Sequence, residues 1–477
     1  MRPVGRERGG GRAAAVTSAA GAAPAVAPGP ATAVRGRAWR TTWLLLAFML
    51  VNFADKTVMG LAANPVMHDL GLTREQFGTA SSAFFALFSL AALAGSYLTR
   101  TVRTSVLLLG MALLWSAAQL PVLVGAAGFG VLVVTRVLLG AAEGPASPVA
   151  LHHLYGWFEQ KDRTLPTAVL LAGAAAGVAV AAPTLGAVIG HWGWRWAFGA
   201  VGLVGLVWAA VWLRYGAEGP LAPPVGRRRA HGPGGAGAST GAAVRVPYRR
   251  LLLSGTWLAA ALGSFAAYWT LSAGLTWSAD YFQEVGGLSL RGASLLIMLS
   301  ALTKGAAMLA HGVLVQRSVK RAAAGLPPRL PWPSGVKTGL LMIVAGAATV
   351  WFAATDVLWL KVVLLLGPLS VTDIVLTVAA TAVSRISPAD RRGVTLGALT
   401  GVFALAGVLA PLVMGHIVDA GATVASGYFG AYGLMAGLVT VAGVAVTCFL
   451  RPERDARRLG TDAQPGAALQ TTAGRGP

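Results

Sequence analysis

The chain has 477 residues, of which 55% are hydrophobic and 12% are charged, and its mean hydropathy is +0.66. Soluble globular domains carry roughly 25% charged residues, so this composition excludes a soluble protein of several domains. Apolar runs of about 20 residues, the length that crosses a bilayer as a helix, recur between Trp43 and Leu450. Backbone groups in lipid must hydrogen-bond within their own segment, so these runs predict an all-α protein embedded in a lipid bilayer.

Twelve membrane-spanning helices follow one another along the chain. We expect them at residues 41–63, 78–98, 105–126, 130–152, 165–188, 194–214, 252–278, 289–314, 335–355, 358–383, 394–417 and 426–450. Eleven or thirteen helices are the alternatives, and either number would place the two termini on opposite sides of the membrane. A linker at 215–250, rich in Gly, Pro and Arg, separates a six-helix half (41–214) from a second one (251–450). The tails at 1–40 and 451–477 are expected to be disordered.

The net charge of +21 suits a nucleic-acid-binding surface in principle, but the positions of the charges indicate membrane topology instead. Lys and Arg concentrate in both tails, in the 215–250 linker and in alternate loops, whereas the other loops hold only Arg74, Arg195, Arg291 and Lys361. Cytoplasmic loops of membrane proteins are enriched in these two residues. We therefore expect both termini and the linker in the cytoplasm, and no nucleic-acid partner.

The single cysteine, Cys448, lies in the last apolar run, which excludes an intramolecular disulfide and a cysteine metal site. The seven histidines form no ligand cluster along the sequence, so we expect no metal and no cofactor. The stretch Ala13–Ala33 resembles a signal peptide weakly, but its prolines and low leucine content favour a disordered tail.

Four charged residues lie deep in the first half: Asp55 and Lys56 in the first helix, and Arg136 and Glu143 in the fourth. Charged side chains at membrane depth are costly unless paired or hydrated, so these four should face a central cavity. Arg136 and Glu143 are two helical turns apart and therefore share one face. Because the two helices run in opposite directions, Arg136 lies at about the depth of Asp55, and the two can pair.

This arrangement predicts a proton-dependent anion site. Protonation of Asp55 would free Arg136, and Lys56 beside it, to hold a substrate carboxylate. A structural network of ion pairs that fixes helix packing is the alternative interpretation.

The second half offers fewer candidates. Lys304 in the eighth helix and Asp373 in the tenth each lie about fifteen positions into helices of the same direction, so they can meet at one depth. A structural ion pair is the default interpretation, and a part for Lys304 in substrate binding and for Asp373 in proton coupling is the alternative. Tyr268 and Trp269 in the seventh helix are either cavity aromatics that contact substrate or ordinary packing residues.

The two halves carry a matching pattern after their second helices. Gly95 begins the segment G-S-Y-L-T-R-T-V-R, and Gly312 begins G-V-L-V-Q-R-S-V-K. With the six-plus-six layout, this pattern resembles the signature G-x-x-x-D-R-x-G-R-R of the major facilitator superfamily, whose two halves are parallel repeats. Thr99 and Gln316 stand where the signature has an acidic residue that helps to latch the two halves together.

Four further motifs resemble one group within that superfamily, the anion:cation symporters. Asn52 to Lys56 reads N-F-A-D-K and resembles the group's N-[YF]-x-D-R in the first helix. Arg136 to Pro145 matches R-x-x-x-G-x-x-E-[AG]-P in the fourth helix. Residues 157–163 resemble the loop W-F-x-x-x-x-R, and residues 193–198 resemble the turn G-W-R-W-x-F before the sixth helix.

The resemblance implies the major facilitator fold and a secondary active transporter of a small organic anion, such as a sugar acid or an aromatic acid. It implies proton symport by alternating access, in a monomer in the bacterial plasma (inner) membrane. The expected substrate contacts are Lys56 and Arg136, with Asn52 from the same motif, and the expected proton carriers are Asp55 and Glu143. Lys56 stands where the group has Arg, which replaces a planar fork by a point charge.

Three other functions are alternatives to anion symport: export, catalysis within the membrane, and anion sensing. A proton-antiport exporter of a drug or metabolite would carry G-P-x-x-G-G in the fifth helix, and Ala182 to Gly186 resembles only the end of that motif. An intramembrane enzyme would need a nucleophile with a base, or metal ligands, at membrane depth, and the sequence shows neither. A receptor that senses an anion without moving it is the third, and the six-plus-six layout argues against it.

Overall fold

The computed structural model describes residues 30–99, 101–159, 162–222, 246–326, 333–388 and 391–461. The regular secondary structure in these ranges is helical, as the sequence predicted. The chain from Ala38 onward forms one compact unit, and the arrangement below is that of this unit.

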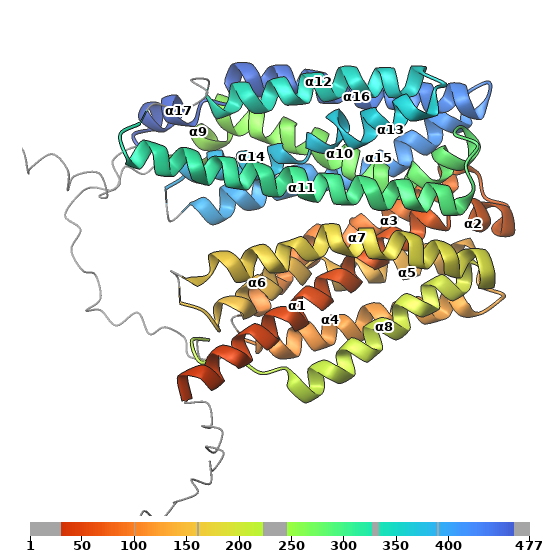
Figure 1. The fold of residues 1–477 in the computed structure, drawn as a ribbon, viewed down its shortest axis with the longest axis horizontal. Helices are drawn as coiled ribbons and strands as arrows, with labels where there is room; N and C mark the ends of the chain where they lie inside the picture. The colour runs from red at the N-terminus through yellow and green to blue at the C-terminus, as the bar shows by residue number, and fades with distance from the viewer. Residues whose placement is uncertain are drawn as a thin grey trace, which may run out of the picture. The chain divides into compact units, whose positions relative to one another are not determined.

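The first half contains α1 (Pro30–Leu61), α2 (Ala63–Leu70), α3 (Arg74–Leu98), α4 (Thr104–Gln119), η1 (Leu120–Leu123), α5 (Phe129–Glu143), α6 (Ala146–Tyr155), α7 (Thr164–Trp192) and α8 (Trp194–Tyr215). The second half contains α9 (Tyr248–Leu252), α10 (Gly255–Glu284), α11 (Leu290–Ala323), α12 (Ser334–Ala354), α13 (Leu358–Leu366), η3 (Pro368–Val371), α14 (Ile374–Ile386), α15 (Arg392–Asp419), α16 (Val424–Phe449) and α17 (Pro452–Leu459). Figure 1 shows the helices of each half gathered together, with α3, α7, α11 and α15 between the two groups.

Eleven helical segments of the described chain are long and apolar enough to cross a membrane. They coincide with eleven of the twelve predicted spans. The remaining predicted span, 78–98, is α3, a helix of 25 residues with no charged side chain between Phe77 and Leu98. Two spans are interrupted where a proline removes a backbone donor: one at Gly144–Pro145, between α5 and α6, and one at Gly367–Pro368, between α13 and η3.

Several predicted boundaries are wrong. Residues 30–40, expected in a disordered tail, belong to α1, and α11 continues well past its predicted end at 314. The C-terminal segment expected to be disordered begins with the helix α17. This helix is attached to α10, because Asp455 accepts hydrogen bonds from the backbone N–H and the hydroxyl of Thr256, at 2.8 and 2.6 Å. The rest of both tails and most of the 215–250 linker lie outside the described residues, as do Arg100 and Lys161 of the sequence motifs.

The two ends of the bundle differ in the elements that they carry. Figure 1 shows α9 and α17 at one end, which we call the linker end, and α2 at the other, which we call the α2 end. The halves meet mainly where α3 packs along α15 and α7 packs along α11.

At the α2 end α3 and α15 are in backbone contact. A Cβ added to Gly78 would lie 2.4 Å from the carbonyl oxygen of Pro411, and one added to Gly415 would lie 2.5 Å from that of Arg74. Only glycine permits this approach between α3 and α15. The helices α7 and α11 are also close there, but through a side chain, since a Cβ on Gly186 would lie 2.3 Å from Ser294 Oγ.

Toward the linker end the same helices separate. Gly393 lies about four turns from Gly407 on nearly the same face of α15. A Cβ on Gly393 meets nothing within 4 Å among the described residues, whereas one on Gly407 would meet Phe85 at 2.6 Å. In α11 a Cβ on Gly305 would lie 3.0 Å from Ala175, but one on Gly312, two turns on, meets nothing within 4 Å in the part of the chain that the structure describes. The two halves therefore touch at the α2 end and diverge toward the linker end.

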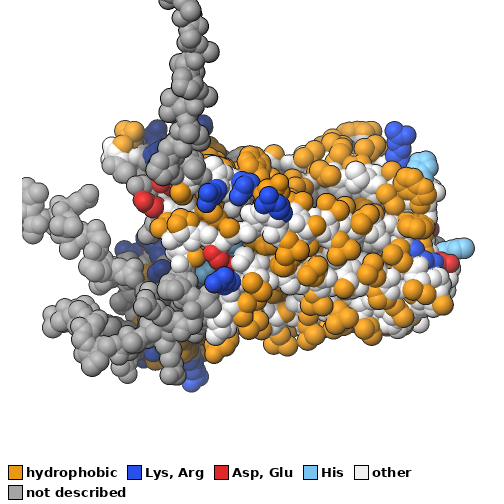
Figure 2. Space-filling view, turned by 90° about the horizontal axis from the view of Figure 1, so that it is seen from below, with side chains coloured by type: hydrophobic (Ala, Val, Ile, Leu, Met, Phe, Trp, Pro, Cys, Tyr) orange, Lys and Arg blue, Asp and Glu red, His pale blue; other side chains and the backbone are white. Residues whose placement is uncertain are grey.

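The outside of the bundle is apolar. Large apolar side chains remain exposed on many helices, for example Leu203 at 61% and Val207 at 56% on α8. Figure 2 shows one face on which apolar side chains are spread over much of the described surface, with charged side chains at the end away from the grey residues and others between the grey end and the middle. A surface of this extent matches a hydrocarbon environment, so the chain is a multi-pass membrane protein.

Candidate substrate site

The first half buries the four charged residues that the sequence singled out. Asp55 and Lys56 come from α1, and Arg136 and Glu143 from α5. Asp55 is 0% exposed, Glu143 1% and Arg136 2%. Charges buried in this way must be paired or hydrogen-bonded, and the structure arranges them in two separate groups.

Lys56 and Glu143 form the first group. The Lys56 ammonium makes an ion pair with the Glu143 carboxylate and donates a hydrogen bond of 2.7 Å to Asn52 Oδ1. The ammonium also lies over three aromatic rings, with 4.9, 5.4 and 5.8 Å to the centroids of Phe53, Phe84 and Phe88. Rings at this distance attract a cation, so Lys56 is held from several sides.

Asp55, Gln119 and Arg136 form the second group. The sequence predicted a direct pair of Asp55 with Arg136, but the structure places Gln119 of α4 between them. Gln119 Nε2 donates to Asp55 Oδ1, and Gln119 Oε1 accepts from Arg136 Nη2 at 2.7 Å. Gln119 was missed because a lone amide in an apolar helix carries little sequence signal.

Both charged ends of this second group have unused hydrogen-bonding capacity. Asp55 Oδ2 and Arg136 Nε are buried and have no hydrogen-bond partner among the described residues. The guanidinium also lies 5.0 Å from the centroid of the Phe198 ring of α8. Arg136 therefore has a donor left for a further acceptor.

A small cavity of ≈ 30 Å³ lies against these charges, between the two halves. Its lining includes Asp55, Lys56 and Arg136 from the first half, and Ser272 and Thr276 of α10 from the second. Ser81, Phe84, Phe85, Met59 and Leu275 complete it. A molecule bound there would touch two cations, one acid and three hydroxyl groups, and it would contact both halves at once.

The predicted aromatic pair lies beside this cavity rather than in its lining. The Tyr268 ring packs against Phe403 at 5.0 Å and against Phe85 of the other half at 6.0 Å. Trp269 is 5% exposed and packs against Phe265 at 6.0 Å. Tyr268 therefore sits at the junction of the halves, whereas Trp269 packs within the second half.

The structure brings Lys304 and Asp373 together, as their depths predicted. Lys304 Nζ of α11 lies 3.6 Å from Asp373 Oδ2, where the chain leaves η3 and enters α14. The two side chains are 24% and 13% exposed. They are not part of the cavity lining.

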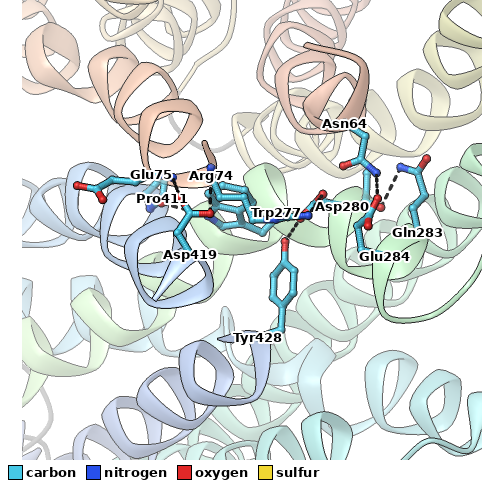
Figure 3. A network of polar contacts seen from close by, with 11 residues as sticks. Asn64, Arg74, Glu75, Trp277, Asp280, Gln283, Glu284, Pro411, Asp419 and Tyr428 are labelled. Atoms are coloured by element: carbon cyan, nitrogen blue, oxygen red, sulfur yellow. Dashed lines mark hydrogen bonds and ion pairs between the residues drawn. The ribbon is translucent and has the colours of Figure 1, made fainter. Parts of the chain in front are cut away.

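A third cluster of buried charges lies at the α2 end, and the sequence did not predict it. Arg74, expected to be a loop cation, donates to Asp280 of α10 through Nε at 2.9 Å and Nη2 at 3.3 Å. The Tyr428 hydroxyl of α16 donates to the same carboxylate, which is fully buried. Figure 3 shows these contacts linking α3 of the first half to α10 and α16 of the second.

The N-terminus of α3 is held by the other half as well. Asp419 at the end of α15 accepts from the backbone N–H groups of Arg74 at 3.2 Å and Glu75 at 2.7 Å (Figure 3). A carboxylate at this position is stabilised by the positive end of the helix dipole. His416 lies 3.0 Å from Glu75, and Asn64 donates to Glu284 at 3.0 Å. These polar contacts close the α2 end.

Comparison with known proteins identifies the family. A sequence profile of the Major Facilitator Superfamily matches residues 44–372, and the chain belongs to this superfamily of membrane transporters. It is therefore a transporter and not an enzyme, as the sequence predicted.

The relatives of the chain include several bacterial carriers. It is 25% identical to the hexuronate transporter of Bacillus subtilis (strain 168) over 415 residues, which cover 84% of this chain and 92% of that protein. It is 26% identical to the probable L-galactonate transporter of Escherichia coli (strain K12) over 88% of this chain and 91% of that protein. The probable sulfoacetate transporter of Cupriavidus necator is 27% identical over 80% of this chain and 88% of that protein. The resemblance to the anion:cation symporter group is thereby confirmed.

Solved structures show the same fold. A bacterial homolog of the human lysosomal transporter Spinster, in an inward-facing and occupied conformation, superposes with a TM-score of 0.69 at 18% identity. The superposition covers 88% of this chain and 98% of that one. A D-xylose-proton symporter superposes with a TM-score of 0.62 at 14% identity, over 86% and 97% of the two chains. The predicted major facilitator fold is confirmed.

Proposed function

We propose that this transporter is a proton-coupled symporter of a small organic anion, with sugar acids as the favoured substrate class. The proposal rests on the burial of Lys56 and Arg136 at a cavity between the halves. In this structure Lys56 pairs with Glu143, and Arg136 is linked to Asp55 through Gln119. An anion and protons can replace these internal partners together.

The charge balance of the cavity explains why the two cargoes would travel together. With Asp55 and Glu143 ionised, the two acids neutralise Lys56 and Arg136, and an added carboxylate would be repelled. Protonation of one or both acids leaves one or two positive charges for a monoanion or a dianion. Proton binding and anion binding would then each favour the other.

The hydroxyl groups around the cavity support a hydroxylated substrate. Ser81, Ser272 and Thr276 line the cavity together with the charged residues. Hexuronate and galactonate, named for two of the relatives, are carboxylates with several hydroxyl groups. The Ser81 hydroxyl is buried without a hydrogen-bond partner among the described residues. An aromatic acid would leave it unpaired, and unpaired buried polar groups are costly.

The excess of Lys and Arg at the linker end supports a cytoplasmic location for that end. On this assignment the α2 end faces outward, and the closed α2 end with separated helices at the linker end corresponds to an inward-facing state. Alternating access would then break the α2-end contacts and bring the linker ends of the helices together.

The direct test uses purified protein in liposomes with an imposed pH gradient. We expect accumulation of labelled glucuronate or galactonate against its concentration gradient, driven by the proton gradient and abolished by a protonophore. Glu143→Gln, which mimics a permanently protonated acid, should still exchange labelled for unlabelled anion but should not accumulate it.

Arg195→Ala, which removes a cation far from the cavity, is the matched control and should accumulate the anion as the unaltered protein does. Absence of uptake for every carboxylate offered would contradict the proposed substrate class. Accumulation by Glu143→Gln equal to that of the unaltered protein would exclude Glu143 as the coupling acid.

A further inference from the structure

The amide of Gln119 has its orientation dictated by its two neighbours. An ionised carboxylate only accepts hydrogen bonds, and a guanidinium only donates them. While Asp55 is ionised, the amide nitrogen must therefore face Asp55 and the amide oxygen must face Arg136. The hydrogen bonds to Asp55 Oδ1 and from Arg136 Nη2 have this arrangement.

The packing around Gln119 keeps its side chain at this position. Gln119 is 0% exposed and is the last residue of α4. A Cβ added to Gly202 of α8 would lie 3.2 Å from Gln119 Cβ, so the α8 backbone packs directly on the side chain. Rotation of the terminal amide by half a turn needs less space than moving the side chain away.

We propose that Gln119 is a positioning residue that transmits the protonation state of Asp55 to Arg136. This inference rests on the proposed function and names the group that couples its two cargoes. When Asp55 takes up a proton, its carboxyl gains an O–H donor, which the amide oxygen can accept if the amide reverses. The NH₂ group then faces the guanidinium, donor against donor, and Arg136 is released toward the cavity to bind the substrate carboxylate.

The reverse step follows the same bonds. Loss of the proton makes Asp55 an acceptor again, so the amide nitrogen returns to it and the amide oxygen recaptures Arg136. Anion affinity therefore falls when Asp55 is ionised, and by reciprocity a bound anion favours protonation of Asp55. No covalent bond other than the O–H of Asp55 changes.

The other charged groups near Asp55 do not provide this link. Glu143 and Arg136 of α5 and Lys56 of α1 act on Asp55 electrostatically. Lys56 and Glu143 are bonded to each other and to Asn52, apart from the Asp55 group. Among the described residues, Gln119 is the side chain that hydrogen-bonds to both Asp55 and Arg136.

The test measures anion affinity as a function of pH in full-length protein, with galactonate and glucuronate as probes and titration calorimetry as the readout. The unaltered protein should lose affinity by about 5- to 150-fold between pH 5 and pH 8, the usual range for coupled sites. Gln119→Leu removes both hydrogen bonds at similar volume. Its anion affinity should change clearly less over this range than that of the unaltered protein, because only the electrostatic effect of Asp55 and Glu143 on the anion remains.

Ser116→Ala is the matched control, because Ser116 is equally buried and lies one turn earlier on α4. Ser116→Ala should keep the pH dependence of the unaltered protein. If Gln119 only supported the packing of α4, Gln119→Leu would keep that pH dependence as well. Gln119→Met replaces the leucine variant if the latter does not fold.

Retention of the full pH dependence in a folded Gln119 variant would overturn the inference while leaving the proposed function intact. An unaltered protein that binds neither probe nor any other organic anion would instead remove the proposed function, and this inference with it.

Discussion

The buried charges at the central cavity and those at the α2 end differ in how they are distributed between the halves. Asp55, Lys56, Arg136 and Glu143 all belong to the first half, and so do the partners of their ion pair and hydrogen bonds, so these contacts do not have to break when the halves move. Arg74 and Asp280 come from different halves, as do Asp419 and the N-terminus of α3. The first kind can store a charge or bind a ligand throughout a transport cycle, whereas the second kind must break each time the α2 end opens.

Substitutions in the two kinds of charge pair should therefore affect two different properties, the affinity for the anion and the balance between conformations. A charge pair confined to one half changes affinity when it is altered, because the pair exists in both states. A charge pair that bridges the halves changes the balance between states, because it exists in only one of them.

Arg136→Ala should abolish anion binding. Loss of one partner of a desolvated, hydrogen-bonded charge pair costs about 2–5 kcal/mol, which is a loss of about thirty-fold to several thousand-fold in affinity. Titration calorimetry with galactonate or glucuronate measures it. Affinity equal to that of the unaltered protein would show that the anion binds elsewhere.

Arg74→Ala should open the α2 end. Asp280 would then be buried without its ion-pair partner in the closed state, a penalty of about 3–5 kcal/mol that opening to water relieves. A cysteine at Ser81, in a Cys448→Ser background, should react faster with an impermeant thiol reagent added at the α2 side.

The matched control for Arg74→Ala is Arg195→Ala. Arg195 also pairs with a carboxylate at the α2 end, that of Asp69, but both residues belong to the first half. It should leave the labelling rate at Ser81 unchanged. Equal labelling in the two variants would contradict the division between bridging and confined pairs.

Asp419→Asn should open the α2 end less than Arg74→Ala does. The amide side chain can still accept a hydrogen bond from the N-terminus of α3, but it loses the interaction of a full charge with the helix dipole, about 0.3–1 kcal/mol. The labelling rate at Ser81 should rise by no more than about five-fold, in proportion to that energy. An effect larger than that of Arg74→Ala would show that the contact of Asp419 with α3, and not the Arg74–Asp280 ion pair, mainly keeps the α2 end closed.

The Asp69–Arg195 pair should have the smallest effect, on stability alone. Hydrogen bonds from Arg195 and from the Trp194 indole hold the pKa of Asp69 below its usual value. A lowered pKa means that the pair stabilises the folded state above the ordinary pKa of 3.8 and that this contribution disappears as pH falls below it. Because the pair is partly exposed, its contribution is at most about 1 kcal/mol.

Thermal unfolding of Asp69→Asn checks this last expectation. The variant should melt slightly lower than the unaltered protein at pH 7, and the difference should shrink progressively as pH falls below 3.8. A difference that grows on acidification would show that another group is responsible.

The sequence by itself determined the spans and the superfamily of this protein. Each apolar run must satisfy its own backbone in lipid, so its helical state does not depend on the rest of the chain. The charged residues of α1 and α5 were also identified from the sequence, because a charged side chain inside an apolar run is costly in a membrane and usually has a function. The depths of Lys304 and Asp373 likewise predicted that they meet, since helix geometry alone sets them.

Tertiary structure alone decided which buried groups are partners. Gln119 stands between Asp55 and Arg136 because α4 packs beside α1 and α5, a contact that the periodicity of one helix does not contain. Lys361, expected in a loop, is buried in α13 and donates to the Tyr281 hydroxyl at 2.6 Å. Arg74 finds Asp280 far along the chain in the other half. A hydrogen bond depends on positions to within a few tenths of an ångström, and only the packing of all the helices sets positions that finely.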